Sequence, residues 1–373
     1  MMTRKDLAQI RRRFSPEKND ISTIRGCYVN EKKEIVSSFA KSPLSLPQSE
    51  SEHYLSLFKK TLGGAPGRNQ FSIPVHTDDP SGMLLCRLQT SDLKDEKSVT
   101  DLFRTIIENT EFEGSYLILA IHDVFSIPKK NSSIHTDAPD LSDNVFSYIL
   151  VSVCPVKLTK PLLTFFSDDR DFHTVEPDLA VSSPELGFMY PTFEDGGADI
   201  SSALYYTKDA DNLHADFVDA VFSAQAPESV SDTRQAFYDT LSDSLDEKMT
   251  FDVVQTIHDN LVGQLADRKK DAVPLEVSRR EISSLLETCD VPKEKLAAFE
   301  KTYNETFGKG VGLTADTVVN VKQFEIEAGE AVKISVDPER SDLIEMKKVD
   351  GRRAVIVWVE GDVTVNGVEV NIT

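Results

Sequence analysis

Basic side chains are concentrated in two short segments of this chain, and both segments have the chemistry needed to bind phosphate. Their members are Arg11, Arg12, Arg13, Lys347, Lys348, Arg352 and Arg353. Guanidinium groups donate two parallel hydrogen bonds to a phosphate, and ammonium groups add point charges. The second segment surrounds an Asp-Gly pair, so a tight turn would gather its cations at one tip. These residues predict contacts with the backbone of DNA or RNA.

The two basic segments contrast with the charge of the whole chain, which is strongly negative. The protein has 373 residues and a formal net charge of −21. Residues 1–35 nevertheless contain nine Lys or Arg against five Asp or Glu. Such an asymmetry is typical of a segment that meets an anionic partner. The overall charge excludes a protein that coats nucleic acid with its entire surface, and it disfavours contact with anionic membranes.

Both basic segments also have an explanation that needs no ligand. Arg11, Arg12 and Arg13 fall in the last turn of an expected helix, where cations complement the helix dipole and pair with surface acids. The cations of 347–353 could instead keep the edges of a small β module from pairing with other chains. The sequence leaves both alternatives open for each segment.

A second set of side chains could hold a divalent metal ion. His122 and Asp123 directly follow the apolar run 116–121, and the stretch 168–173 adds carboxylates and His173. Strand ends in α/β sheets are common places for sites, and histidine with aspartate can ligate a divalent metal. A metal-dependent hydrolase that uses these residues is therefore an alternative to nucleic-acid binding. Their spacing matches no ligand motif, so we expect a polar turn at 122–123 with no metal and no cofactor.

The chain lacks the motifs of familiar enzymes and the signals for export. It contains no Gly-x-Ser-x-Gly, His-Glu-x-x-His or dinucleotide-binding sequence. Its cysteines, Cys27, Cys86, Cys154 and Cys289, form no Cys-x-x-Cys pair, so neither a zinc knuckle nor a redox pair is indicated. No run approaches the roughly 20 apolar residues of a membrane helix, and the start lacks a signal peptide. We therefore expect a cytoplasmic protein with no membrane partner.

The elements that must position these residues indicate an α+β protein in three parts. Residues 1–209 are expected to form a mixed α/β sheet domain that begins with the basic helix. Apolar residues at helical spacing predict further helices around 54–62 and 99–106. Runs of β-forming residues predict strands at 116–121, 146–153, 162–166, 186–190 and 203–207. The strand at 146–153 is almost entirely apolar, which indicates burial on both faces.

The remainder of the chain changes from helical to β patterning. Residues 210–315 show apolar stripes at helical spacing and predict a helical segment. Residues 316–373 are predicted to form a small antiparallel β module. Asp350-Gly351 and Asn366-Gly367 provide the positive φ angles that two-residue hairpin turns require. The polar stretch 129–143 is expected to be an exposed loop.

The chain resembles one known family along its whole length. The likeness rests on Ile24-Arg-Gly-Cys-Tyr-Val-Asn30 after the basic start, on Phe146-Ser-Tyr-Ile-Leu150 and on the closing Val365-Asn-Gly-Val368. These phrases are similar to those of the domain-of-unknown-function family 4317. The resemblance implies a bacterial protein, and it implies no activity, cofactor or site residue.

The clustered cations favour a non-enzymatic protein that docks on nucleic acid, on the nucleoid or on a ribonucleoprotein such as the ribosome. The metal-dependent hydrolase ranks second, because several unrelated turns would have to converge on one site. A scaffold that binds only proteins is the third alternative. Serine at positions 11–13 is expected to weaken nucleic-acid binding and to leave the fold intact, because Leu7, Ile10 and Phe14 form the apolar face of that helix.

Overall fold

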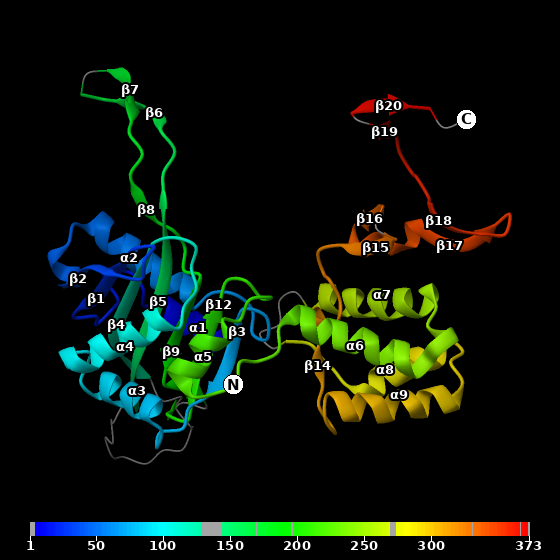
Figure 1. Ribbon diagram of the computed structural model, residues 1–373, viewed down its shortest axis with the longest axis horizontal. Coiled ribbons are helices and arrows are strands. Elements are labelled where there is room, and N and C mark those ends of the chain that lie inside the picture. The colour runs from blue at the N-terminus through cyan, green and yellow to red at the C-terminus, as the bar shows by residue number, and fades with distance from the viewer. Residues whose placement is uncertain are drawn as a thin grey trace, which may run out of the picture. The chain divides into compact units, whose positions relative to one another are not determined.

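The fold is known from a computed structural model, which describes residues 4–127, 144–168, 170–194, 197–268, 274–329, 331–365 and 367–371. The chain divides into two compact units, Met1–Ser229 and Val230–Thr373 (Figure 1). A large antiparallel sheet lies in the first unit and a group of helices in the second, which confirms the predicted α+β class. The expected loop at 129–143 lies outside the described residues.

One antiparallel sheet forms the centre of the N-terminal unit. Its strands are β1 (Ile24–Val29), β2 (Ile35–Lys41), β3 (Gln70–Pro74), β4 (Tyr116–Ile127), β5 (Asn144–Leu158), β8 (Leu179–Val181), β9 (Leu186–Tyr190) and β12 (Ser202–Thr207). Their order is β2-β1-β4-β5-β9-β12-β3, and β8 pairs with the far end of β5. The long central strands β4 and β5 pair from Tyr116 opposite Pro155 to Ile127 opposite Asn144.

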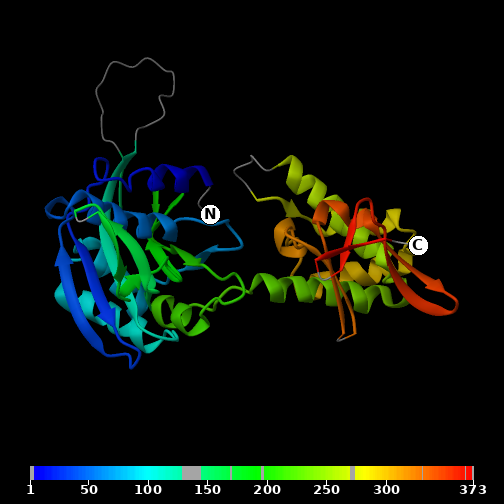
Figure 2. The same cartoon turned by 90° about the horizontal axis from the view of Figure 1, so that it is seen from above.

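Helices cover both faces of this sheet, so the unit has two cores. One face is covered by α1 (Arg4–Arg11) and α2 (Gln48–Thr61), and the other by α3 (Pro80–Thr90), α4 (Glu96–Glu108) and α5 (Ala215–Phe222) (Figure 2). Alternate residues of β4 enter alternate cores: Ile118 belongs to one and Leu117 to the other. Val151 and Leu150 of β5 divide in the same way, which confirms that this strand is buried on both faces.

Helix α5 belongs to the N-terminal unit, although its periodicity alone groups it with the helices that follow residue 210. The rings of Phe217 and Phe222 lie 6.4 and 5.2 Å from the ring of Phe188 in β9. Tyr205 of β12 adds a further contact, with its ring 5.9 Å from that of Phe217. These aromatic contacts hold α5 on the sheet, so the chain enters the second unit only after Ser229.

The C-terminal unit contains the later helices of the segment expected at 210–315, followed by the β hairpins expected within 316–373. Its helices are α6 (Val230–Leu245), α7 (Phe251–Asp267), α8 (Arg279–Thr288), α9 (Lys293–Thr306) and the short α10 (Ala315–Val318). The small strands β13 (Glu276–Val277) and β14 (Leu313–Thr314) pair beside them. Buried side chains such as Phe237, Leu261 and Phe299 form the core between the helices.

Antiparallel hairpins follow the helices, as the sequence predicts, but they do not join into one sheet. They are β15 (Phe324–Ala328) with β16 (Val332–Val336), β17 (Ile344–Val349) with β18 (Arg352–Val357), and β19 (Val363–Val365) with β20 (Val368–Val370). Asp350 and Gly351 have φ angles of 48° and 78°, the conformation of the predicted two-residue turn. Gly367 has a φ of 81°, and Asn366 lies outside the described residues.

Four short strands form hairpins apart from these sheets. β6 (Leu162–Phe166) pairs with β7 (Asp171–Val175), and β10 (Thr192–Glu194) pairs with β11 (Gly197–Asp199). The β6–β7 hairpin projects from the sheet beyond the end of β5 (Figure 1). Three short 3-10 helices complete the described elements: η1 (Pro43–Ser45), η2 (Asp246–Lys248) and η3 (Pro338–Leu343), the last with a kink at Arg340.

Candidate functional site

Arg13, at the end of the basic start, is engaged with a buried carboxylate. Its Nε lies 3.0 Å from Oδ2 of Asp123, and its Nη2 lies 3.1 Å from Oδ1 of the same group. The Nη2 group also donates to a carboxylate oxygen of Asp20 at 2.8 Å and to the carbonyl of Val124 at 2.7 Å. The Asp123 side chain is completely buried and that of Arg13 is 15% exposed. A phosphate would therefore have to compete with Asp123 for this guanidinium.

Two further groups complete the hydrogen bonding of Asp123. The Tyr148 hydroxyl donates to it at 2.8 Å, and the backbone N–H of Asp20 donates at 3.1 Å. Burial alone would lower the pKa of Arg13, but the hydrogen bonds to Asp123 and Asp20 outweigh burial and raise that pKa. Burial, followed by the nearby Asp123 charge, holds the pKa of Tyr148 well above its ordinary value. The ion pair and the neutral phenol thus fix the segment after α1 to strand β4.

Arg11 and Arg12 have different surroundings from Arg13. Arg12 is exposed and forms no ion pair with any residue that the structure describes. Arg11 is half-buried, and its buried Nε finds no hydrogen-bond partner in the described part of the chain. The predicted role in phosphate binding therefore rests on these two residues within the basic start.

His122 and Asp123 lie inside strand β4, which corrects the prediction of a polar turn at the end of a strand. Pairing with β5 continues for four residues beyond Asp123, as far as Ile127, so the apolar run at 116–121 is only the first half of the strand. His122 is buried, and its Nε2 lies 2.7 Å from the Ser147 hydroxyl and 3.3 Å from Asp92. Burial lowers the pKa of His122, and the charge of Asp92 only partly opposes this.

The predicted metal ligands do not converge in the part of the chain that the structure describes. Consecutive residues of a strand point to opposite faces of a sheet, so His122 and Asp123 point into different cores. His173 lies on β7, in the projecting hairpin, with its ring 5.6 Å from that of Phe166. Among residues 4–127, 144–168 and the other described ranges, no three His, Cys, Asp or Glu side chains form a metal-binding group.

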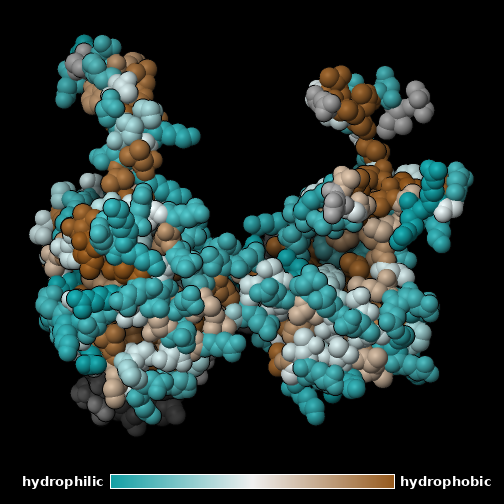
Figure 3. Space-filling model, in the orientation of Figure 1, coloured by the Kyte–Doolittle hydropathy of each residue, from teal (hydrophilic) through white to brown (hydrophobic). Residues whose placement is uncertain are grey.

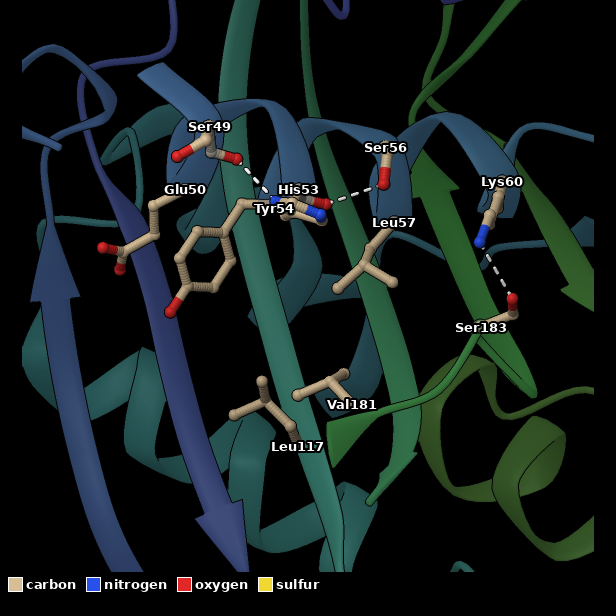
Figure 4. A pocket seen from close by; sticks show the side chains of 10 residues that line it. All are labelled: Ser49, Glu50, His53, Tyr54, Ser56, Leu57, Lys60, Leu117, Val181 and Ser183. Atoms are coloured by element: carbon tan, nitrogen blue, oxygen red, sulfur yellow. Dashed lines mark hydrogen bonds between the residues drawn. The ribbon is translucent and has the colours of Figure 1, made fainter. Parts of the chain in front are cut away.

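A groove of about 520 Å³ lies between α2 and the neighbouring strands (Figure 4). Leu57 of α2 faces Leu117 of β4 and Val181 of β8 across an apolar floor. The polar groups at its ends are already paired: Lys60 donates to Ser183 at 3.0 Å, and Glu50 accepts from Lys41 at 2.9 Å. The groove therefore combines an apolar floor with polar side chains that already have hydrogen-bond partners.

The β17–β18 hairpin brings the second basic cluster together, as its Asp-Gly turn predicts. Lys348 lies directly opposite Arg353 in the ladder, and Val349 lies opposite Arg352. Because facing residues share one side of a hairpin, Lys348 and Arg353 project from one face. Lys347 and Arg352 project from the other face, since side chains alternate along each strand. The cations therefore surround the tip, divided between its two faces.

The cations of this hairpin differ in how far they are neutralised. Lys347 pairs with Glu345 at 3.1 Å, and its ammonium lies 5.8 Å from the centre of the Trp358 ring. Lys348, Arg352 and Arg353 are exposed and form no ion pair with residues in the described ranges. Figure 3 shows that the tip of the hairpin is hydrophilic, whereas its base is apolar. The tip is a compact positive patch on an acidic protein.

The relationship of the chain to known proteins is decided by a family model that matches residues 2–368. The chain belongs to the family described as a domain of unknown function, DUF4317. This match confirms the resemblance seen in the sequence, and it covers both units. No curated protein and no solved structure matches the chain.

Two side chains of this DUF4317 chain contact the candidate site residues, although the sequence gives little or no indication that they do: Tyr148 and Trp358. Tyr148 contacts Asp123 from 25 positions away, and no local pattern connects them. Trp358 is the one tryptophan of the sequence, and it follows a predicted strand beside the basic cluster. The Trp358 side chain is 54% exposed and lies next to Lys347. A lone aromatic residue close in sequence to a cluster of cations is the only sequence signal for this contact.

Two general features of this DUF4317 chain bear on its chemistry. Its four cysteines are unpaired, and burial raises the pKa of the Cys154 thiol to about 12, which makes it a poor nucleophile. In the part of the chain that the structure describes, no helix has the length and apolar character needed to cross a bilayer.

Proposed function

We propose that this DUF4317 protein binds single-stranded nucleic acid through the β17–β18 hairpin. The proposal is carried by the placement of Lys348 directly opposite Arg353, both exposed and both without an acidic partner among the described residues. Side chains that face each other in this way have Cβ atoms about 5 Å apart, and like charges at that position destabilise a hairpin. A phosphate bound between the two cations would remove the repulsion and gain charge-assisted hydrogen bonds.

An aromatic ring on the same hairpin supports single strands over duplexes. Trp358 directly follows β18, and its backbone N–H donates to Leu343 at 2.8 Å, which extends the ladder by one residue. Alternation along the strand places its ring on the face that carries Lys347 and Arg352. Unpaired bases stack on exposed aromatic rings, whereas the bases of a duplex cannot reach one. On this face, Arg352 near the tip and the ring near the base match a phosphate and a base of one strand, while Lys348 and Arg353 would bind phosphate on the opposite face.

The acidity of the chain shapes how this binding should behave. A net charge of −21 repels polyanions from most of the surface, so contacts are confined to the hairpin and any further cations that face outward. Arg11 and Arg12 are candidates for such additional contacts in the N-terminal unit. Binding through three free cations should be of low affinity and strongly dependent on salt.

The experiment measures binding of a fluorescein-labelled 20-nucleotide oligo(dT) by anisotropy at several salt concentrations. For single strands, each phosphate contact contributes a slope of about 0.7 in log K against log salt. The double variant Lys348→Ser/Arg353→Ser should therefore bind more weakly, with a slope reduced by about 1.4. The control, Lys309→Ser/Lys322→Ser, removes the same charge from exposed positions of the same unit and should bind almost like the parent.

Three outcomes would contradict the proposal. The first is a parent protein that binds neither oligo(dT) nor oligo(U) at low salt. The second is a folded Lys348→Ser/Arg353→Ser variant whose affinity and salt slope equal those of the parent. If the control variant loses as much affinity as the test variant, the attraction arises from net charge and the hairpin has no special role.

A further inference from the structure

The β6–β7 hairpin, with the neck that joins it to the sheet, forms a projecting arm that spans residues 158–181. At the neck, β5 and β8 pair only as far as Leu158 opposite Leu179. Pro161 and Pro177 follow on the two sides of the ribbon. Proline has no N–H to donate, so the ladder is interrupted there and begins again as β6 and β7. Within the described residues, each of these two strands pairs only with the other.

Large apolar side chains are exposed along this arm, which is unusual for a surface hairpin. They are Leu158, Leu162, Leu163, Phe165, Phe166, Phe172, Val175, Leu179 and Val181, each between 41% and 69% exposed. Figure 3 shows apolar side chains on the arm and at its neck. With aromatic side chains presenting about 150–250 Å² each and aliphatic ones somewhat less, the arm exposes on the order of 800 Å² of apolar surface. That exceeds the largest patch of a typical monomer, about 300–600 Å².

We infer that the arm is a self-association element, in which β6 pairs antiparallel with β6 of a second copy of this chain. The apolar surface exposed on the whole arm is of the order of the roughly 800 Å² that each partner contributes to a standard interface. Pairing along β6 covers the part of that surface contributed by Leu162, Leu163, Phe165 and Phe166. The free edge of β6 is five residues long, Leu-Leu-Thr-Phe-Phe, and carries no charge. Soluble proteins normally protect such an edge with charges, proline or bulges. Within its five residues β6 has none of these protections, although Pro161 immediately precedes it, and this open apolar edge favours a partner strand.

The sequence of β6 selects a second copy as that partner. Thr164 is the central residue of the strand, so a two-fold axis at this position places it opposite Thr164 of the second copy. Leu163 then lies opposite Phe165 of the second copy, and Leu162 lies opposite its Phe166. Every apolar side chain of β6 meets another apolar side chain, and cross-strand pairs of this kind stabilise a sheet.

Charges just beyond β6 fit the same register. Pairing of two β6 strands about Thr164 places Lys160 of one copy opposite Asp168 of the other. Both residues are exposed and have no ion-pair partner in the described part of the chain. The edge of β7 does not share this symmetry. An axis at His173 would place Asp171 opposite Val175 and would bring two imidazoles together. Pairing through β6 therefore joins the two arms into one four-stranded sheet.

The experiment measures the molar mass of the full chain by light scattering after size-exclusion chromatography, at about 20 μM protein. We expect the parent to be a dimer. Thr164→Lys places two like charges opposite each other on the axis, and Thr164→Glu does the same with the opposite sign, so each variant alone should be a monomer. An equimolar mixture of the two variants should regain the dimer, because unlike charges then face each other.

A matched substitution on the other strand of the arm is the control. Thr174→Lys adds the same charge at an exposed position of β7, away from the β6 edge, and should remain dimeric. Circular dichroism checks that each variant is folded. A monomeric parent, a dimeric Thr164→Lys variant, a mixture that stays monomeric, or equal loss of the dimer in Thr174→Lys would each overturn the proposal. If the parent is monomeric and the arm instead binds a different protein, self-association is ruled out and the arm has another partner.

Discussion

Arg12 and Arg13 are neighbours in the sequence, yet their side chains have opposite roles. Arg13 neutralises the fully buried Asp123, whereas Arg12 is exposed. Removing one member of a buried ion pair leaves the other charge without a partner in a medium that solvates it poorly. We therefore predict that Arg13→Ser lowers the free energy of unfolding by about 3 kcal/mol. Arg12→Ser should change it by less than about 0.5 kcal/mol.

Urea denaturation of the full chain measures both values, and the transition of the N-terminal unit is the relevant one. This prediction revises the expectation that serine at positions 11–13 leaves the fold intact. The apolar face of α1 would survive the change, but the guanidinium that closes the network around Asp123 would not. Equal stability of the Arg12→Ser and Arg13→Ser variants would show that the Arg13–Asp123 pair contributes nothing.

His122 should make the stability of the N-terminal unit depend on pH. Its pKa is lowered in the folded state, chiefly by burial, so the unfolded chain takes up this proton at a higher pH than the folded one. Stability is therefore complete above the unfolded pKa of about 6.5 and falls as the pH decreases below it. The uptake of one proton by the unfolded chain lowers the free energy of unfolding by up to about 1.4 kcal/mol for each pH unit.

The variant His122→Gln removes this proton while keeping a side chain able to hydrogen-bond to Ser147. The test compares unfolding free energies of parent and variant between pH 7 and pH 5. We expect the parent to lose stability more steeply on acidification than the variant. His214, whose pKa burial also lowers, stays in both proteins and cancels in the comparison. Parallel pH profiles for the two proteins would contradict the account of His122.

At the scale of elements, the β17–β18 hairpin combines a favourable turn with an unfavourable pair of charges. Arg353→Glu places a carboxylate opposite Lys348 and should stabilise the hairpin by about 0.2–1 kcal/mol, because unlike charges then face each other. The same change should abolish binding of oligo(dT). Thermal unfolding and anisotropy measure the two effects. A loss of both stability and binding would mean that Arg353 has a structural role that the described contacts do not show.

Elements whose pattern is local could be predicted from the sequence, and elements whose pattern is interrupted could not. Strand β5 contains a nearly continuous apolar run, and Asp350-Gly351 is a dipeptide that favours positive φ angles. Both elements could therefore be predicted from the sequence. Helix α3 was not predicted, because Pro80 and Gly82 are of residue types that are unfavourable inside a helix. Pro80 is at the helix start, where proline fits. Gly82 is required because a Cβ there would lie 2.1 Å from the His76 carbonyl oxygen.

The candidate site divides in the same way between local and distant signals. The basic hairpin is encoded by seven consecutive residues, 347–353, so its cations and its turn were predictable together. The pairing of Arg13 with Asp123 spans 110 positions, and only the fold creates it. The assignment of His122 and Asp123 to a turn was wrong for a related reason. Polar residues normally end an apolar strand, but here Arg13 and Tyr148 compensate for a buried carboxylate within it.

At the scale of the whole molecule, the two units have separate cores. Buried residues of the sheet and its helices belong to Met1–Ser229, while Phe237, Leu261 and Phe299 belong to Val230–Thr373. We predict that residues 230–373 fold on their own and retain the affinity of the full chain for oligo(dT). Circular dichroism and anisotropy of this fragment provide the test. A folded fragment that no longer binds would show that the N-terminal unit supplies essential contacts.

The fluorescence of Trp358 tests the central claim most directly, because it is the one tryptophan in the chain and lies on the proposed binding hairpin. Titration with unlabelled oligo(dT) at low salt should quench this fluorescence as bases stack on the ring, and Lys348→Ser/Arg353→Ser should shift the titration to higher concentration. Heparin, a polyanion without bases, should compete for the cations and cause little quenching. Unchanged tryptophan fluorescence at saturating oligo(dT), or equal quenching by heparin, would contradict the account.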